Sequence, residues 1–239
     1  MTLSCDRLER ALAPAAQTAA LFGASSRVSL INDLGHRMTC AGYSSFEKLY
    51  DAVNDRCCGT PSIILFLKCT EAYFDPVEKK ARLLVGLLRD AHGWEFDGAR
   101  ELGAPVDYHE IRGHLRIGTV VINDSVLNQK VEADCVSGSD DNLIRAAVST
   151  AIETIARYTE DSDPLRIHYV LWKYFRVICR RYEPSCCGQS TLDVDQLDPA
   201  FVESFRAGTG WSGCAFSSFC DSFKHGRFPA EYSYGGDYY

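Results

Sequence analysis

The chain has 239 residues, a formal net charge of −7 at pH 7, 46% hydrophobic and 24% charged residues. This length and composition are typical of a globular protein with its own core, and they exclude a largely disordered chain. The acidic balance argues against a broad nucleic-acid-binding surface, so we expect no sequence-specific nucleic-acid partner. The longest apolar runs, IILFL and LLVGLL, are too short to span a bilayer, so we expect no membrane partner.

Helix signals recur along the chain as capping residues that precede a helical hydrophobic pattern. The first predicted helix runs from Ser4 to about Leu21, bends at Pro14, and makes residues 1–24 an N-terminal helical arm. Later helices are predicted to begin at Ser or at Asp-Pro, and the one that covers 77–93 ends at Gly93. These later helices cover 45–53, 77–93, 142–158, 165–182 and 200–205.

Strand signals lie between the predicted helices, in short runs with β-branched or aromatic residues bounded by Gly, Pro, Asn or Asp. The predicted strands are RVSLI (27–31), SIILFLK (62–68), PVDYHEI (105–111), HLRIGTVVI (114–122) and QKVEADCV (129–136). Arg112-Gly113 suits a tight hairpin between the third and fourth strands. The pattern therefore predicts a single α+β domain, residues 1–239, with an antiparallel sheet core and helices packed around it.

Two motifs suggest metal binding. His109-Glu110-Ile111-Arg112-Gly113-His114 has one residue more than the zinc-protease HExxH motif, so its two imidazoles would not share a helix face, and we expect no zinc there. The triplets Cys57-Cys58-Gly59 and Cys186-Cys187-Gly188 lack the Cys-x2-Cys spacing of structural zinc sites. A composite site would remain conceivable from Cys186, Cys187, Cys214, Cys220 and His225, which are close in sequence.

The stretch GWSGCAFSSFC resembles the surroundings of a papain-like nucleophile, with Cys214 as the candidate. Such an enzyme needs a histidine and an orienting residue from a further lobe, whereas only His225 follows. No phosphate-binding loop and no nucleophile elbow is present. We therefore predict that the protein is not an enzyme, with Cys214 and His225 as the alternative catalytic pair.

The chain ends in PAEYSYGGDYY, a tail over residues 229–239 that has no helical period. The chain holds 12 tyrosines and 11 cysteines, which ionise at about pH 10 and about pH 8.5 in unperturbed form. An assembly held by buried tyrosine hydroxyls would repel itself apart in alkali. We therefore predict assembly contacts, released by alkali, at Tyr232, Tyr234, Tyr238 and Tyr239.

The order of these elements resembles that of the cypovirus polyhedrins, which crystallise inside infected insect cells and embed virions. The resemblance covers about residues 26 to 160 and includes the strand that ends at Cys135-Val136-Ser137-Gly138 before the next helix. It implies an antiparallel β-sandwich-like core wrapped by helices and assembled through trimers. It also implies bound nucleotide, although no residue here matches such a contact.

The sequence thus predicts a viral structural protein that self-assembles into an intracellular crystalline matrix, the occlusion body. Its partners would be other copies of itself, as trimers in a lattice, and virions. Its location would be crystalline inclusions in the host cytoplasm, which agrees with the absence of a signal-peptide pattern at the N-terminus. The alternative is a cysteine-rich intracellular regulatory or interaction module, with zinc binding as an option.

Overall fold

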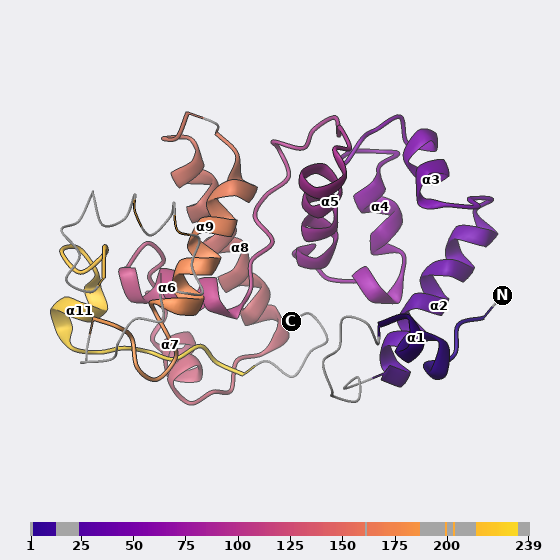
Figure 1. Cartoon of the computed structure of the whole chain (residues 1–239). Helices are drawn as coiled ribbons and strands as arrows, with labels where there is room; N and C mark the ends of the chain where they lie inside the picture. Colours follow the sequence, from indigo (N-terminus) through magenta and orange to yellow (C-terminus); the bar gives the residue numbers. More distant parts are fainter. Residues whose placement is uncertain are drawn as a thin grey trace. The chain divides into compact units, whose positions relative to one another are not determined.

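A computed structural model describes residues 2–12, 24–160, 162–186 and 214–233, together with the isolated positions Pro199 and Glu203. The chain divides into two compact units, Met1–Leu102 and Gly103–Tyr239, which we call unit 1 and unit 2. Helices form both units in the described part of the chain (Figure 1). No helix among these residues is long and apolar enough to cross a membrane.

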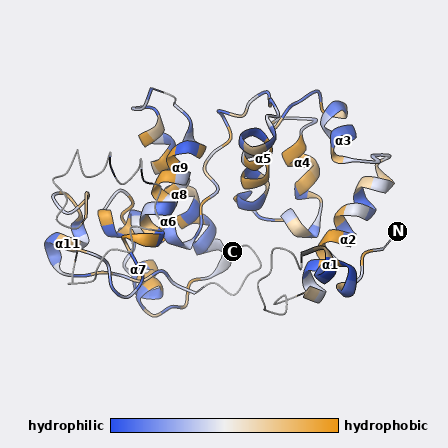
Figure 2. Cartoon of the chain, in the orientation of Figure 1, coloured by the Kyte–Doolittle hydropathy of each residue, from blue (hydrophilic) through white to orange (hydrophobic). Residues whose placement is uncertain are grey.

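Unit 1 is a set of helices of 3 to 17 residues around a small apolar core. Its elements are α1 (Cys5–Leu12), α2 (Ala24–Cys40), α3 (Phe46–Ala52), α4 (Ile63–Lys68), the 3-10 helix η1 (Glu71–Tyr73) and α5 (Lys79–His92). Leu49, Ile63, Leu67 and Ala81 are completely buried in this core, and α4 is coloured as strongly hydrophobic in Figure 2. Burial of these side chains stabilises α3 and α4, which are too short to be stable alone.

Unit 2 contains the longest described helix and the larger core. Its elements are α6 (Tyr108–Ile117), α7 (Ser125–Glu132), α8 (Gly138–Ala156), α9 (Pro164–Val177) and α11 (Asp221–His225). Helices α6, α8 and α9 pack against one another (Figure 1). Their core includes Val148, Ile152, Tyr174 and Phe175, all at most 1% exposed, and the chain near Tyr232 packs on it.

Several predicted helices are confirmed where capping residues fixed their ends. The helix predicted over 165–182 is α9, which has Asp163 as N-cap and Pro164 in its first turn. The helix predicted over 77–93 is α5, which ends at Gly93 in the left-handed conformation. Of the predicted arm, α1 lies among the described residues, whereas 13–23 and nearly all of 200–205 lie outside them.

The predicted α+β class with a β-sandwich-like core is wrong. The described residues form no strand, and their one bridge is an isolated parallel pair, Arg56 with Asp97. The runs predicted as strands lie in helices in whole or in part: 27–31 in α2, 62–68 at the cap and body of α4, and the first half of 129–136 in α7. Short apolar runs fit a buried helix and a strand equally well, so composition alone selected the wrong element.

The predicted hairpin at Arg112-Gly113 is also wrong, because both residues lie inside α6. Asp107 caps this helix in a reciprocal capping box with Glu110, and Gly118 ends it with φ of 83°. A Cβ at Gly113 would be 2.3 Å from the Phe175 ring, so only glycine fits at this position of the helix. The glycine therefore marks a close approach of α6 to α9 rather than a turn.

We predict that Gly113→Ala lowers the stability of unit 2. Alanine gains about 1 kcal/mol of helix propensity, but the clash with Phe175 should cost about 1–3 kcal/mol or more. Urea unfolding followed by circular dichroism should show the loss. Gly35→Ala in α2 is the control, because a Cβ there has no neighbour within 4 Å and should be neutral or stabilising. Equal stability of both variants would contradict the close packing.

Candidate ligand-binding site

The side chain of Arg116, near the end of α6, joins two chain segments through their backbone carbonyls. Its Nε donates to the carbonyl of Pro229 at 2.7 Å. Its terminal nitrogens donate to the carbonyls of Arg180 at 2.7 Å and Arg181 at 2.8 Å. The side chain is completely buried, so these bonds replace the water that a guanidinium requires. Arg116 thereby fastens the C-terminal segment, which we define as residues 227–233, to the chain after α9.

Arg112, one turn earlier on α6, makes a second connection of the same kind. Its Nε donates to the Cys179 carbonyl at 2.8 Å, and one terminal nitrogen donates to the Phe175 carbonyl at 2.7 Å. Its other terminal nitrogen pairs with the Glu231 carboxylate at 2.7 Å, with both side chains buried. A buried pair of this kind is costly to break because one charge is left without a partner.

Two buried acidic side chains at the start of α6, Asp107 and Glu110, bond to side chains of α9. Asp107 accepts hydrogen bonds from the backbone of the first turn and from the Trp172 indole Nε1 at 2.7 Å. Glu110 lies 2.8 Å from Nδ1 of His168 and is completely buried. Burial raises the pKa of Glu110, and the His168 imidazole opposes that rise. These contacts tie α6 to α9 and leave the four groups committed to one another.

Tyr232, predicted as an assembly contact, lies in the core of unit 2. Its hydroxyl donates to Oδ1 of Asp141 at 3.0 Å, and Arg145 Nε donates to Oδ2 of the same carboxylate at 2.9 Å. All three side chains are buried. Tyr232 therefore has a role inside its own chain, as an anchor for the C-terminal segment. Tyr234, Tyr238 and Tyr239 lie outside the described residues.

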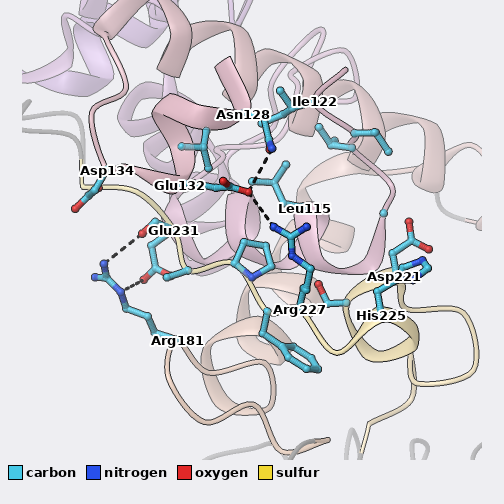
Figure 3. A pocket seen from close by; sticks show the side chains of 18 residues that line it. Leu115, Ile122, Asn128, Glu132, Asp134, Arg181, Asp221, His225, Arg227 and Glu231 are labelled. Carbon is cyan, nitrogen blue, oxygen red and sulfur yellow. Dashed lines mark hydrogen bonds and ion pairs between the residues drawn. The ribbon is translucent and has the colours of Figure 1, made fainter. Parts of the chain in front are cut away.

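A pocket of about 960 Å³ opens beside the anchored C-terminal segment, between that segment, α7, α11 and the chain after α6 (Figure 3). Its apolar wall includes Leu115, Val120, Ile122, Val131, Phe228 and Pro229. The volume is at the upper end of the range for small-molecule sites, which are typically apolar with a few polar groups. The carbonyl of Pro229 is the one held by Arg116, so the arginine also positions this wall.

Two ion pairs edge the pocket, and Figure 3 shows both. Arg227 donates to Glu132 at 3.1 Å, and these two side chains are exposed. Arg181 donates to the Glu231 carbonyl at 3.2 Å, with its Nε 3.9 Å from the Glu231 carboxylate. Each guanidinium therefore already has an acidic partner, so the pocket offers no spare positive charge from these arginines.

Asp221 and His225 form a different part of the rim. They lie one turn apart on α11, and Figure 3 shows them beside each other, away from the ion pairs. Neither side chain has a hydrogen bond or ion pair with any described residue. The Asp221 carboxylate lies over Gly118, where an added Cβ would be 2.2 Å from its Oδ2. The glycine therefore lets an uncommitted carboxylate lie at the edge of the apolar wall.

The predicted cysteine and histidine sites are only partly brought together. Cys214 accepts a hydrogen bond from the Tyr174 hydroxyl at 3.0 Å and another from the Cys186 thiol. His225 lines the pocket and Cys214 does not, so nothing in the structure supports the alternative catalytic pair. Cys187 lies outside the described residues. Within the described ranges, no group of three or more histidine, cysteine or acidic side chains is placed to hold a metal ion.

The two histidines of the HExxxH-like motif serve separate contacts on α6. His109 lies 3.1 Å from a terminal nitrogen of Arg112, whereas His114 is completely buried and contacts the Thr119 hydroxyl at 2.6 Å. Burial lowers the pKa of His114 to about 4, so it is neutral at pH 7. Sequence reasoning missed both the pocket and the buried arginines; the one available signal was the Asp107–Glu110 capping pattern, which marks α6 as a helix.

Comparison with known proteins identifies no relative: no protein-family model, no curated protein and no solved structure matches the chain. The function of the pocket must therefore be inferred from its own chemistry.

We predict that Tyr232→Phe destabilises unit 2 by about 1–3 kcal/mol, because Asp141 loses a hydrogen-bond donor in a buried site. Tyr158→Phe is the matched control, since Tyr158 is 89% exposed and should tolerate the change. Chemical denaturation of both variants at pH 7 measures the difference. A Tyr232→Phe protein as stable as Tyr158→Phe would show that the C-terminal segment is not anchored through this hydroxyl.

Proposed function

We propose that unit 2 binds a small molecule with an apolar body and a positively charged group in the pocket beside the C-terminal segment. The observation that carries this proposal is the Asp221 carboxylate, uncommitted to any described residue, at the edge of an apolar wall. The apolar body would lie against Leu115, Val120 and Phe228. The Asp221 carboxylate is exposed, so a cation in the pocket could pair with it directly.

The charges around the pocket favour a cation over an anion. Four carboxylates line it, those of Glu132, Asp134, Asp221 and Glu231, against two guanidinium groups that already pair with two of the four. An anionic ligand would have to displace one of these ion pairs or approach unpaired carboxylates. A nucleotide, which the family resemblance implied, is therefore a poor fit for this pocket.

Binding of primary amines tests the proposal. Benzylamine and hexylamine should bind more tightly than benzyl alcohol and hexanoate in saturation-transfer NMR or calorimetric titration. Asp221→Asn should weaken amine binding by about tenfold, because it removes the charge and keeps the shape. Glu160→Gln is the control, as it removes one exposed acid of unit 2 that does not line the pocket. Equal affinity for amine and alcohol, or unchanged amine binding in Asp221→Asn, would contradict the proposal.

Assembly into a crystalline matrix and the zinc-binding interaction module stay predictions of the sequence. The matrix protein was inferred partly from a resemblance that implies a β-sandwich, and the described residues contain none. Its remaining argument, the three tyrosines at positions 234, 238 and 239, concerns residues outside the described ranges. The pocket is the feature that the geometry supports directly, so we prefer ligand binding.

A further inference from the structure

The sulfur of Cys214 is surrounded by hydrogen-bond donors, at a place separate from the pocket. The Tyr174 hydroxyl donates to it at 3.0 Å and itself accepts from the Ala215 backbone N–H at 3.1 Å. The Cys186 side chain and the backbone N–H groups of Phe216 and Ser217 also favour negative charge on it, and the Ser217 N–H donates to the Cys214 carbonyl at 3.1 Å. Donors gathered on one atom stabilise negative charge there, as in the backbone concavities that bind anions.

These donors favour the thiolate form of Cys214. The hydrogen bond from Cys186 is the largest cause, with Tyr174 and the backbone adding to it against burial, and together they lower the pKa of Cys214 to about 6. The other thiols near it differ: burial raises the pKa of Cys179 and of Cys220. The nearest guanidinium contact, from Arg116, goes to the Cys179 sulfur at 3.4 Å. Cys214 is therefore the one ionised sulfur among these three.

The side chains of Cys186 and Cys214 are also in contact, which a disulfide between them would require. They are in direct hydrogen-bond contact, come from distant positions in the sequence, and are both partly exposed. Cys57 and Cys58 provide a contrast in unit 1, where the two sulfurs are 3.7 Å apart. Neighbouring residues have Cα atoms about 3.8 Å apart, below the range of about 4.4–6.8 Å for ordinary disulfides. That pair is therefore poorly suited to closing a bond.

We propose that Cys214 and Cys186 form an oxidation-sensitive thiol pair, in which Cys214 reacts with hydroperoxides and Cys186 resolves the product as a disulfide. The Cys214 thiolate attacks one oxygen of the peroxide, the O–O bond breaks, and hydroxide leaves to give a sulfenic acid. The Cys186 thiol then attacks that sulfur, the S–O bond breaks, and water leaves after proton transfer. Overall, two thiols and one hydrogen peroxide give one disulfide and two waters.

The disulfide would link the chain just after α9 to the chain just before α11. Cys186 follows the turn in which the Ser185 N–H donates to the Ile178 carbonyl at 3.0 Å. Cys214 precedes Phe216, which packs on Tyr174 with ring centroids 4.7 Å apart. Oxidation would therefore cross-link the described chain at residue 186 to the described chain at residue 214, on the side of α9 where Phe216 packs on Tyr174. The pocket and its ligand are not needed for this reaction.

The test uses the full chain and peptide mapping by mass spectrometry. At pH 7, iodoacetamide should label Cys214 at least tenfold faster than Cys135, which is exposed, and the rate should rise with pH through an apparent pKa near 6. Tyr174→Phe should move that midpoint upward while it keeps the ring packing. Stoichiometric hydrogen peroxide should produce a peptide pair joined through Cys186 and Cys214.

Two serine variants make the result decisive. In Cys186→Ser the disulfide should vanish and dimedone should trap the Cys214 sulfenic acid, whereas Cys187→Ser should still form the Cys186–Cys214 bond. The proposal is overturned if Cys214 is labelled no faster than Cys135, or if peroxide yields no Cys186–Cys214 disulfide in the wild-type chain. It is also overturned if Cys187→Ser removes the oxidised product and Cys186→Ser does not.

Discussion

Two buried guanidinium groups on α6 hold the end of the described chain in place. Arg116 and Arg112 direct their N–H groups to carbonyls at the end of α9 and after it, to the Pro229 carbonyl and to the Glu231 carboxylate. A guanidinium is suited to this because its planar fork presents five donors in fixed directions and stays charged at any relevant pH. The segment beside the pocket has no helix or sheet of its own, so these side chains supply the partners that its backbone lacks.

The pocket depends on this arrangement, and the thiol pair adjoins it. The wall of the pocket at Phe228 and Pro229 belongs to the segment that Arg116 holds. The turn that carries Cys186 follows the carbonyls of Arg180 and Arg181, which the same guanidinium binds. The pocket wall and the turn before Cys186 are thus both held by the Arg116 guanidinium. A buried polar network with some of its hydrogen bonds missing is costly in free energy. We therefore expect the contacts of Arg112 and Arg116 to form together or to be lost together.

Some of this structure could be predicted from the sequence, and the physical reason is locality. Asp163-Pro164 and Gly93 fixed helix ends because a cap acts over a few residues. The short apolar runs at 27–31 and 62–68 have a pattern that fits a strand and a buried helix equally well. The prediction of strands there is therefore wrong. The contacts of Arg116 could not be predicted, since they join residues more than 60 positions apart. The sequence places Cys186 and Cys214 in one conceivable metal site, but it gives no sign of the Tyr174 hydroxyl that donates to the Cys214 sulfur.

The central claim is that the Arg116 guanidinium holds the C-terminal segment on unit 2. Peptide-resolved hydrogen exchange of Arg116→Lys tests it most directly, because lysine keeps the charge but cannot reach several carbonyls at once. We expect exchange in residues 227–233 to become at least tenfold faster while the middle of α8 stays protected. Arg166→Lys, a change at a largely exposed side chain, should leave both regions as in the wild type. Unchanged exchange of residues 227–233 in Arg116→Lys would contradict the account.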